Sequence, residues 1–182
     1  AEISLSTGNA TSWNPNANGV IRTIKLIGTT IYAGGDFTTI GGQTRNYLAA
    51  LNNTNGNATA WNPSPNSTVY NMSVTGTSIS VSGTFDYIKS ENRNSVLAIA
   101  KANGLITTWN PNPSGQFGYS SIDAIELNGT TAYVGGNFNT IGGQPRNNIA
   151  EISLSTGNAT SWNPNANAAV RALRLIGTTI YA

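Results

Sequence analysis

The sequence contains no cysteine and no histidine. Without cysteine the chain can form no disulfide bond and can offer no thiolate to a metal ion. Without either residue, the common zinc sites, the Ser-His-Asp triad and Cys-His nucleophile chemistry cannot be built within this chain. We therefore expect no cofactor and no metal site, and we name no catalytic residue.

Charged side chains are also scarce, at 9% of the residues, with a formal net charge of +2. The nine basic residues are spread along the chain, whereas a surface that follows nucleic-acid phosphates needs them clustered. No apolar run approaches the roughly 18 residues of a membrane-spanning helix. We expect neither a nucleic-acid partner nor a membrane span. Asn, Thr, Ser and Gly fill the polar positions instead, which is typical of exposed β structure rather than helices.

Repetition is the main feature that the sequence does have. Trp-Asn-Pro occurs at 13–15, 61–63, 109–111 and 162–164, with spacings of 48, 48 and 53 residues. A period of roughly 40 to 50 residues is typical of propeller blades. We predict an all-β fold, a β-propeller of four-stranded antiparallel blades of about 48 residues each. The predicted parts are a half blade at 1–15, full blades at about 19–63, 67–111 and 120–164, and a half blade at 169–182.

Within one unit, alternating apolar residues and turn signals predict the strands. Residues 1–15 are expected to form a hairpin, as are 20–27 with 31–37. A loop is expected at 38–46, followed by a third strand at 47–52 and a fourth at 57–61. The five extra residues of the longer spacing fall within 113–119.

The sequence also contains a duplication that is longer than one blade. Residues 150–182 repeat residues 1–33 except at positions 19, 20, 21, 23, 24 and 25. The chain also opens within a predicted strand and without an initiator Met, so we expect it to be a piece of a longer protein. The two half blades are complementary, and exchanging them, within one chain or between two, would complete a blade. A homo-oligomer formed in this way is one expectation.

Three motifs carry a family resemblance: Tyr-x-Gly-Gly-x-Phe at 32–37, Ile-Gly-Gly-Gln-x-Arg-Asn at 40–46 and Trp-Asn-Pro at 13–15. The units resemble the delta-sixty class of β-propeller repeats, found in large secreted and surface proteins of bacteria and archaea. They are also similar to kelch repeats, which pair a Gly-Gly at the end of the second strand with a later Tyr and Trp. The resemblance covers essentially the whole chain. It implies an extracellular or cell-surface scaffold or interaction module without catalysis, part of an adhesin-like or structural protein that meets a protein or glycan partner.

The recurring aromatic and glycine residues each allow two interpretations. The four tryptophans are either a sugar-stacking ring or packing between neighbouring blades, and we favour packing. The glycine pairs either cradle an anion or permit close backbone approach near a central channel, and we favour close approach. These residues are Trp13, Trp61, Trp109 and Trp162, with Gly34, Gly35, Gly135 and Gly136.

Candidate binding residues come from a recurring Arg-Asn pair and from the extra loop. Arg45, Arg93 and Arg146 either present a ring of cations to an acidic ligand or tie their loops to carbonyls of the next blade, which we favour. In the loop at 113–119, Gln116, Phe117 and Tyr119 are candidates for a lectin, the first alternative function. The second alternative is an enzyme, which would need two carboxylates about 5 to 10 Å apart at the channel.

Overall fold

The computed structural model describes residues 1–182, and the chain is all-β. Three units of similar build follow one another, and we refer to residues 19–63, 67–111 and 120–164 as units 1, 2 and 3. Unit 1 holds β1 (Ile21–Ile27), β2 (Thr30–Gly35), β3 (Thr39–Ile40), β4 (Gln43–Thr44) and β5 (Leu48–Asn52). Unit 2 holds β6 (Val69–Val74), β7 (Ser78–Gly83), β8 (Tyr87–Ile88), β9 (Glu91–Asn92) and β10 (Val96–Ala100). Unit 3 holds β11 (Ser121–Asn128), β12 (Thr131–Asn137), β13 (Thr140–Ile141), β14 (Gln144–Pro145) and β15 (Ile149–Ser153), and β16 (Arg174–Ile176) and β17 (Thr179–Tyr181) follow it.

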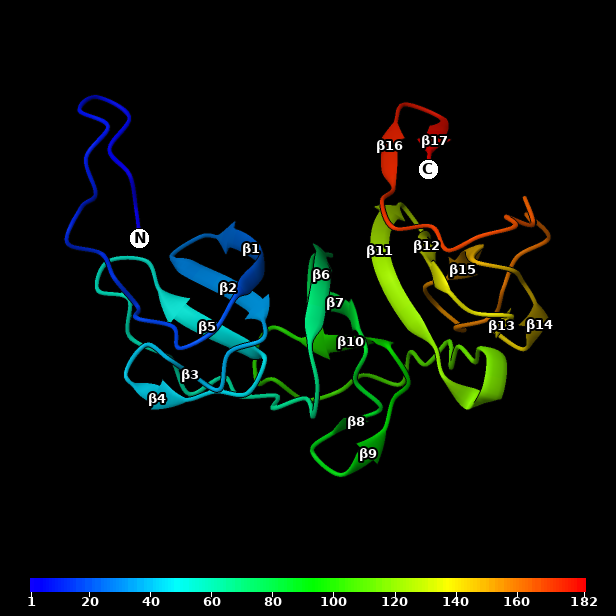
Figure 1. The fold of residues 1–182 in the computed structure, drawn as a ribbon, viewed down its shortest axis with the longest axis horizontal. Coiled ribbons are helices and arrows are strands. Elements are labelled where there is room, and N and C mark those ends of the chain that lie inside the picture. Colours follow the sequence, from blue (N-terminus) through cyan, green and yellow to red (C-terminus); the bar gives the residue numbers. More distant parts are fainter.

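Each unit is an antiparallel sheet of three main strands, in the orders β1-β2-β5, β6-β7-β10 and β11-β12-β15. The innermost strands β1, β6 and β11 face the middle of the molecule, and the sheets stand side by side around them (Figure 1). The N-terminal segment and the β16–β17 hairpin project from the two ends of this array (Figure 1). Neither a closed ring nor a four-stranded sheet is formed.

The predicted fourth strand at 57–61 differs from the structure, where it makes one bridge, Leu51 with Ala58. Two backbone hydrogen bonds flank this bridge, from Asn52 N to Asn57 O and from Thr59 N to Ala50 O. The carbonyl of Thr59 then accepts from the Arg45 guanidinium, so a side chain replaces the strand N–H that would continue the ladder. The predicted loop at 38–46 also differs, because it contains the short β3–β4 hairpin.

A β-bulge interrupts the inner strand of every unit at the same place. The pairing register shifts between Ile21 and Thr23, between Val69 and Asn71, and between Ile122 and Ala124. The extra residues are Arg22, Tyr70 and Asp123. A bulge leaves its extra residue unpaired and re-aims the side chain, so three unlike side chains are presented from equivalent positions.

The hydrophobic core lies mostly between neighbouring sheets. One cluster joins Tyr32 and Leu48 of unit 1 to Val69 and Met72 of unit 2. A second cluster joins Val96 of unit 2 to Ile122 and Ile125 of unit 3, together with further residues of both units. Because each core is shared, a sheet depends on its neighbour for burial, as in other repeat architectures.

Identical sequence occupies two environments at the two ends of the array. Residues 1–13 repeat residues 150–162, and both form the same hairpin with one bridge, Ile3 with Ala10 and Ile152 with Ala159. Ile152 is 0% exposed beside β12, whereas Ile3 is 56% exposed. The predicted hairpin at 1–15 is therefore present, but no sheet covers it.

Helical structure is confined to the short 3₁₀ turn η1 (Gln116–Gly118). None of the structure has the length and apolarity of a helix that crosses a membrane.

Candidate functional site

The inner strands surround a polar hollow of about 500 Å³. We refer to it as the central hollow; its lining residues are Arg22, Tyr70, Thr84, Ser121, Asp123 and Arg171. Three of them are the bulge residues of units 1, 2 and 3, and Arg171 occupies the corresponding place after unit 3. Repetition of the backbone thus brings four side chains of three kinds to one place: two arginines, one tyrosine and one aspartate.

Arg22 is held firmly on one side of the central hollow. Its Nη2 lies 2.7 Å from Oδ2 of Asp36, and its Nε donates to both carboxylate oxygens. Thr68 donates a further 2.7 Å bond to Asp36. Hydrogen bonds from Arg22 and Thr68 hold the pKa of the Asp36 carboxyl below its ordinary value. The guanidinium of Arg22 also lies 5.3 Å from the ring centroid of Tyr70, which is cation–π distance.

Asp123 and Arg171 face one another across the opposite side. Arg171 Nη1 lies 3.5 Å from Asp123 Oδ2. This contact is the single hydrogen bond to the Asp123 carboxylate, and it is a long one. The Asp123 side chain is 11% exposed and that of Arg171 is 81% exposed. A second pair, Glu126 and Arg174, lies at 3.6 Å three residues further along the same two segments.

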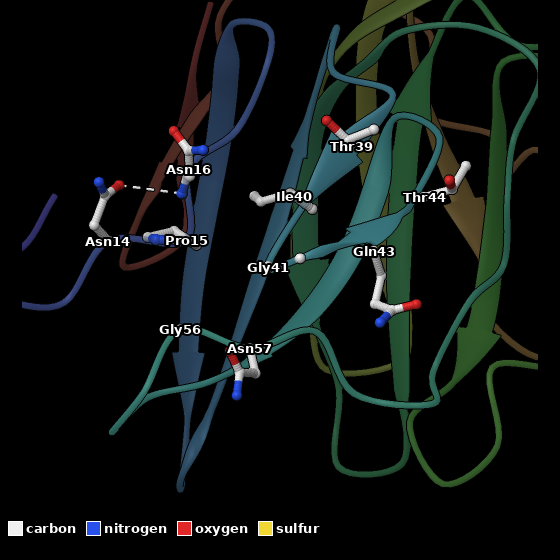
Figure 2. A pocket seen from close by; sticks show the side chains of 11 residues that line it. Asn14, Pro15, Asn16, Thr39, Ile40, Gly41, Gln43, Thr44, Gly56 and Asn57 are labelled. Atoms are coloured by element: carbon white, nitrogen blue, oxygen red, sulfur yellow. Dashed lines mark hydrogen bonds between the residues drawn. The ribbon is translucent and has the colours of Figure 1, made fainter.

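Two further polar clefts lie between successive segments of the chain, of about 360 and 400 Å³. Figure 2 shows the first, where Asn14, Pro15 and Asn16 face the β3–β4 hairpin and the turn at Asn57. Asn14 Oδ1 accepts a 3.1 Å bond from the backbone N–H of Asn16. The second cleft has equivalent residues: Asn110, Pro111, Asn112, Gly142, Gly143, Gln144, Gly157 and Asn158. Neither cleft has a charged residue in its lining.

Glycine at the hairpin turn joins the two walls of each cleft. Gly41 N donates to Pro15 O at 2.6 Å, and Gly41 O accepts from Ala58 N at 2.9 Å. Gly142 makes the same two bonds, with Pro111 and Ala159. A Cβ at Gly41 would lie 2.4 Å from Ala58 N, and Lys89, which takes this place in unit 2, makes neither bond.

The structure places Trp61 and Trp109 between successive sheets, and Trp13 against the sheet of unit 1. Trp13, Trp61 and Trp109 are buried, and each indole N–H donates to a carbonyl at the end of the third strand of the following unit: Asn52, Ala100 and Ser153. Trp61 also meets the ring of Tyr32 edge-on at 5.2 Å. Trp162 is half-buried and meets Tyr133 in the same way, at 5.1 Å.

The glycine pairs of the second strands lie where backbone approaches closely. A Cβ on Gly35 would be 2.0 Å from Val20 O, and one on Gly136 would be 2.0 Å from Ser121 O. Gly34 lies under Val69 of the next unit, and Gly135 lies under Val170. These positions therefore have no room for a side chain.

The recurring arginines contact backbone within their own units. Arg45 donates to Thr44 O at 2.7 Å and to Thr59 O at 2.6 Å, and Arg146 contacts Pro145 O and Thr160 O in the same way. Arg93 donates to Asn92 O and lies 3.0 Å from Glu91. This differs from the expected bridge to the next blade: the arginine closes its own unit, because the fourth segment folds back beside it.

The loop at 113–119 presents aromatic side chains to solvent. Phe117 is 88% exposed and Tyr119 is 82% exposed, with Gln116 beside them. Its base is tightly packed, because a Cβ on Gly115 would lie 1.8 Å from Tyr119 O. Ser120 donates to Pro113 O, and Ser95 of unit 2 donates to Ser120 O at 2.9 Å.

Sequence reasoning missed the central hollow. A signal was present, since Arg22, Tyr70, Asp123 and Arg171 occupy one repeat position, which in every copy holds a charged or aromatic residue directly after an Ile or Val. No three His, Cys, Asp or Glu side chains gather as a metal-binding group.

A family model described as "Domain of unknown function (DUF5122) beta-propeller" matches residues 30–58 and 128–154. These are equivalent stretches of units 1 and 3, from the second strand to the third strand or just beyond it. The match supports a propeller family for this chain. Among curated proteins, none matches the sequence.

Two solved structures of designed proteins are similar in fold. The computationally designed Ika4 protein superposes with a TM-score of 0.63 at 13% identity, covering 94% of this chain and 90% of that one. The computationally designed Ika8 protein gives a TM-score of 0.57 at 13% identity, covering 93% of this chain and 44% of that one. At this identity the likeness concerns the fold alone.

Proposed function

We propose that this chain is a non-catalytic interaction module of a β-propeller protein, working outside the cell or at the cell surface within a larger adhesin-like or structural protein. We assign its repeats to the delta-sixty type, close to kelch. The motifs that suggest this assignment lie on β2, on the β3–β4 hairpin and on the segment beside Trp13. The resemblance of these motifs is what supports the extracellular location.

The observation that carries the proposal is the loop at 113–119. Phe117 and Tyr119 are both more than four-fifths exposed, on a base fixed by Gly115 and Ser120. Exposed aromatics on a rigid support lose little conformational entropy on binding and are enriched among residues that dominate interface energies. The loop is also the main irregularity in an otherwise repeated framework.

Immobilised polysaccharides and extracellular proteins, presented to the 182-residue chain, provide the test. We expect binding that a Phe117→Ser/Tyr119→Ser double variant weakens at least about tenfold. Leu105→Ser is the matched control, since Leu105 is also an exposed apolar residue but lies in another turn. Mass spectrometry of the recovered partner should show no chemical change. Turnover would favour the enzyme alternative, and equal binding by the double variant would contradict the role of the loop.

A lectin-like function is the second candidate, and the two clefts favour it. Their amide and hydroxyl lining, free of charge, suits the neutral hydrogen-bonding groups of a glycan. Gly41→Lys introduces the residue that stands at this place in unit 2, and should remove glycan binding at the first cleft only.

We also propose that copies of the chain associate by exchanging their terminal segments. Residues 1–4 repeat residues 150–153, which pair with β12, and Thr179 and Tyr181 correspond to Thr131 and Tyr133 of that strand. The same register would pair Thr179 with Ser4, Ile180 with Ile3 and Tyr181 with Glu2. It would cover Ile3 and supply the third strand that the β16–β17 sheet lacks.

A further inference from the structure

We propose that the central hollow binds a neutral saccharide, with Asp123 and Arg171 making the principal polar contacts. The proposal adds a third site to the glycan-binding alternative. It rests on that alternative for the class of ligand and on the geometry of the hollow for everything else. The site differs from both the clefts and the loop at 113–119, so each can be tested without the others.

Asp123 is a nearly buried carboxylate with few hydrogen bonds. It is 11% exposed, and its one bond is the 3.5 Å contact with Arg171. An ionised carboxylate can accept about four hydrogen bonds, and burying one without partners is costly. Asp36, on the other side of the hollow, accepts four from Arg22 and Thr68. Asp123 therefore has unused acceptor capacity directed at the hollow.

Arg171 supplies the complementary donors. Its side chain is 81% exposed, and a guanidinium has five N–H donors. A sugar hydroxyl both donates and accepts, so one hydroxyl can donate to Asp123 while it accepts from Arg171. Two adjacent hydroxyls of a pyranose can each contact one of the two groups, because Asp123 Oδ2 and Arg171 Nη1 lie only 3.5 Å apart.

The remaining walls suit the same ligand. Ser121 and Thr84 have hydroxyl groups that can act as donor or acceptor. Tyr70 supplies an aromatic ring for the apolar C–H side of a pyranose. The volume of about 500 Å³ lies within the usual range for small-ligand sites.

Charge balance selects a neutral ligand over an ionic one. Arg22 is paired with Asp36 and Arg171 with Asp123, so the four groups sum to no net charge. A carboxylate ligand at this pair would lie close to the like charge of Asp123, and an ammonium ligand close to that of Arg171, whereas an uncharged hydroxyl can contact both partners.

Chemical-shift titration of the ¹⁵N-labelled 182-residue chain tests the proposal. The probes are D-mannose, D-galactose and N-acetyl-D-glucosamine, each to about 50 mM, with sodium acetate and glycine as charged probes. At least one sugar should shift amides of β6 and β11 with a Kd of about 1 mM. Asp123→Asn should weaken this binding about tenfold or more. Glu126→Gln is the matched control, because Glu126 has a similar arginine pair on the same strand but does not line the hollow.

Thr84→Val provides a second variant in the lining of the hollow, and unchanged shifts elsewhere will show that each variant is folded. The proposal is overturned if no sugar shifts the amides of the hollow, if acetate or glycine binds there in preference, or if Asp123→Asn binds as well as the original chain. Shifts confined to the clefts or the loop at 113–119 also overturn it, and they leave the proposed interaction function standing.

Discussion

The indole nitrogen of Trp109 donates a 2.9 Å hydrogen bond to the backbone oxygen of Ser153, although 44 residues separate them. Trp13 and Trp61 make the same bond to residues 39 positions ahead. The five additional residues are absorbed by the protruding loop at 113–119. One aromatic side chain per unit therefore keeps the sheets in the same relation even where the spacing changes.

Replacing Trp109 by phenylalanine should lower the free energy of unfolding by about 1 to 3 kcal/mol. The variant loses the hydrogen bond to Ser153 and leaves part of the indole volume empty. Urea denaturation measures the loss. Trp162→Phe is the matched control, because the Trp162 indole makes no hydrogen bond and is only half-buried; an equal loss in both variants would refute the role given to the bond.

Gly35→Ala should destabilise the chain by about 3 kcal/mol or more. Its Cβ would lie 2.0 Å from the backbone oxygen of Val20, which cannot move without breaking the β1–β2 pairing. Gly76→Ala should change stability by no more than about 0.5 kcal/mol, since nothing lies within 4 Å of its Cβ. Thermal melting of the two variants compares them directly, and similar melting temperatures would count against the steric argument.

Ser82→Ala should stabilise the chain by about 1 kcal/mol. Ser82 is fully buried in β7, and its hydroxyl has no hydrogen-bond partner. Ser95 is a buried serine whose hydroxyl donates to Ser120 O at 2.9 Å, so Ser95→Ala should destabilise by a similar amount. If both substitutions shift the urea midpoint in the same direction, the presence or absence of a hydrogen-bond partner does not decide how the serine hydroxyl affects stability.

The sequence predicted the strongly apolar strands and their period, because burial against neighbouring units requires the same pattern each time. It did not predict that the segment at 57–61 makes only one bridge instead of a strand. The reason is that the Arg45 side chain donates to Thr59 O, where a paired strand would otherwise supply a backbone N–H. The β3–β4 hairpin was also missed, since two-residue strands are too short to show an alternating pattern.

The candidate site was harder to predict than the fold. The loop at 113–119 was identified as a candidate because it interrupts the period. In the structure its Phe117 and Tyr119 are exposed. The central hollow was missed because its residues come from different units and meet only through the bulges of the inner strands. Comparison of Arg22, Tyr70, Asp123 and Arg171 as one repeat position would have indicated it.

Asp36 should contribute to stability in neutral solution and lose that contribution in acid. Hydrogen bonds from Arg22 and Thr68 lower the pKa of its carboxyl below the ordinary value of 3.8. The contribution is complete above the unfolded pKa and is lost as the pH falls through the lower folded pKa. Urea midpoints at about pH 6 and about pH 2 should therefore show a difference between Asp36→Asn and the original chain that shrinks in acid.

Asp86→Asn is the control for this pH effect, because Asp86 has no arginine partner. A midpoint difference for Asp36→Asn that is the same at both pH values would contradict the stabilising role of the Arg22 pair.

Exchange of terminal segments predicts a specific disulfide in a chain that has no cysteine of its own. Thr131 pairs with Ser153 between β12 and β15, and Thr179 and Ser4 are their counterparts at the two ends. Oxidation of a Thr179→Cys/Ser4→Cys variant should give a cross-link, between chains if two copies exchange ends and within one chain if its own ends meet. Non-reducing electrophoresis distinguishes a doubled mass from the single 19.0 kDa chain.

Two further variants are controls for the cross-link. Thr131→Cys/Ser153→Cys in unit 3 shows whether this pairing geometry accepts a disulfide, and Thr179→Cys/Ser6→Cys tests the register. Cross-linking in the unit 3 control but not in the terminal pair, or equal cross-linking out of register, would mean that residues 1–4 do not pair with β17.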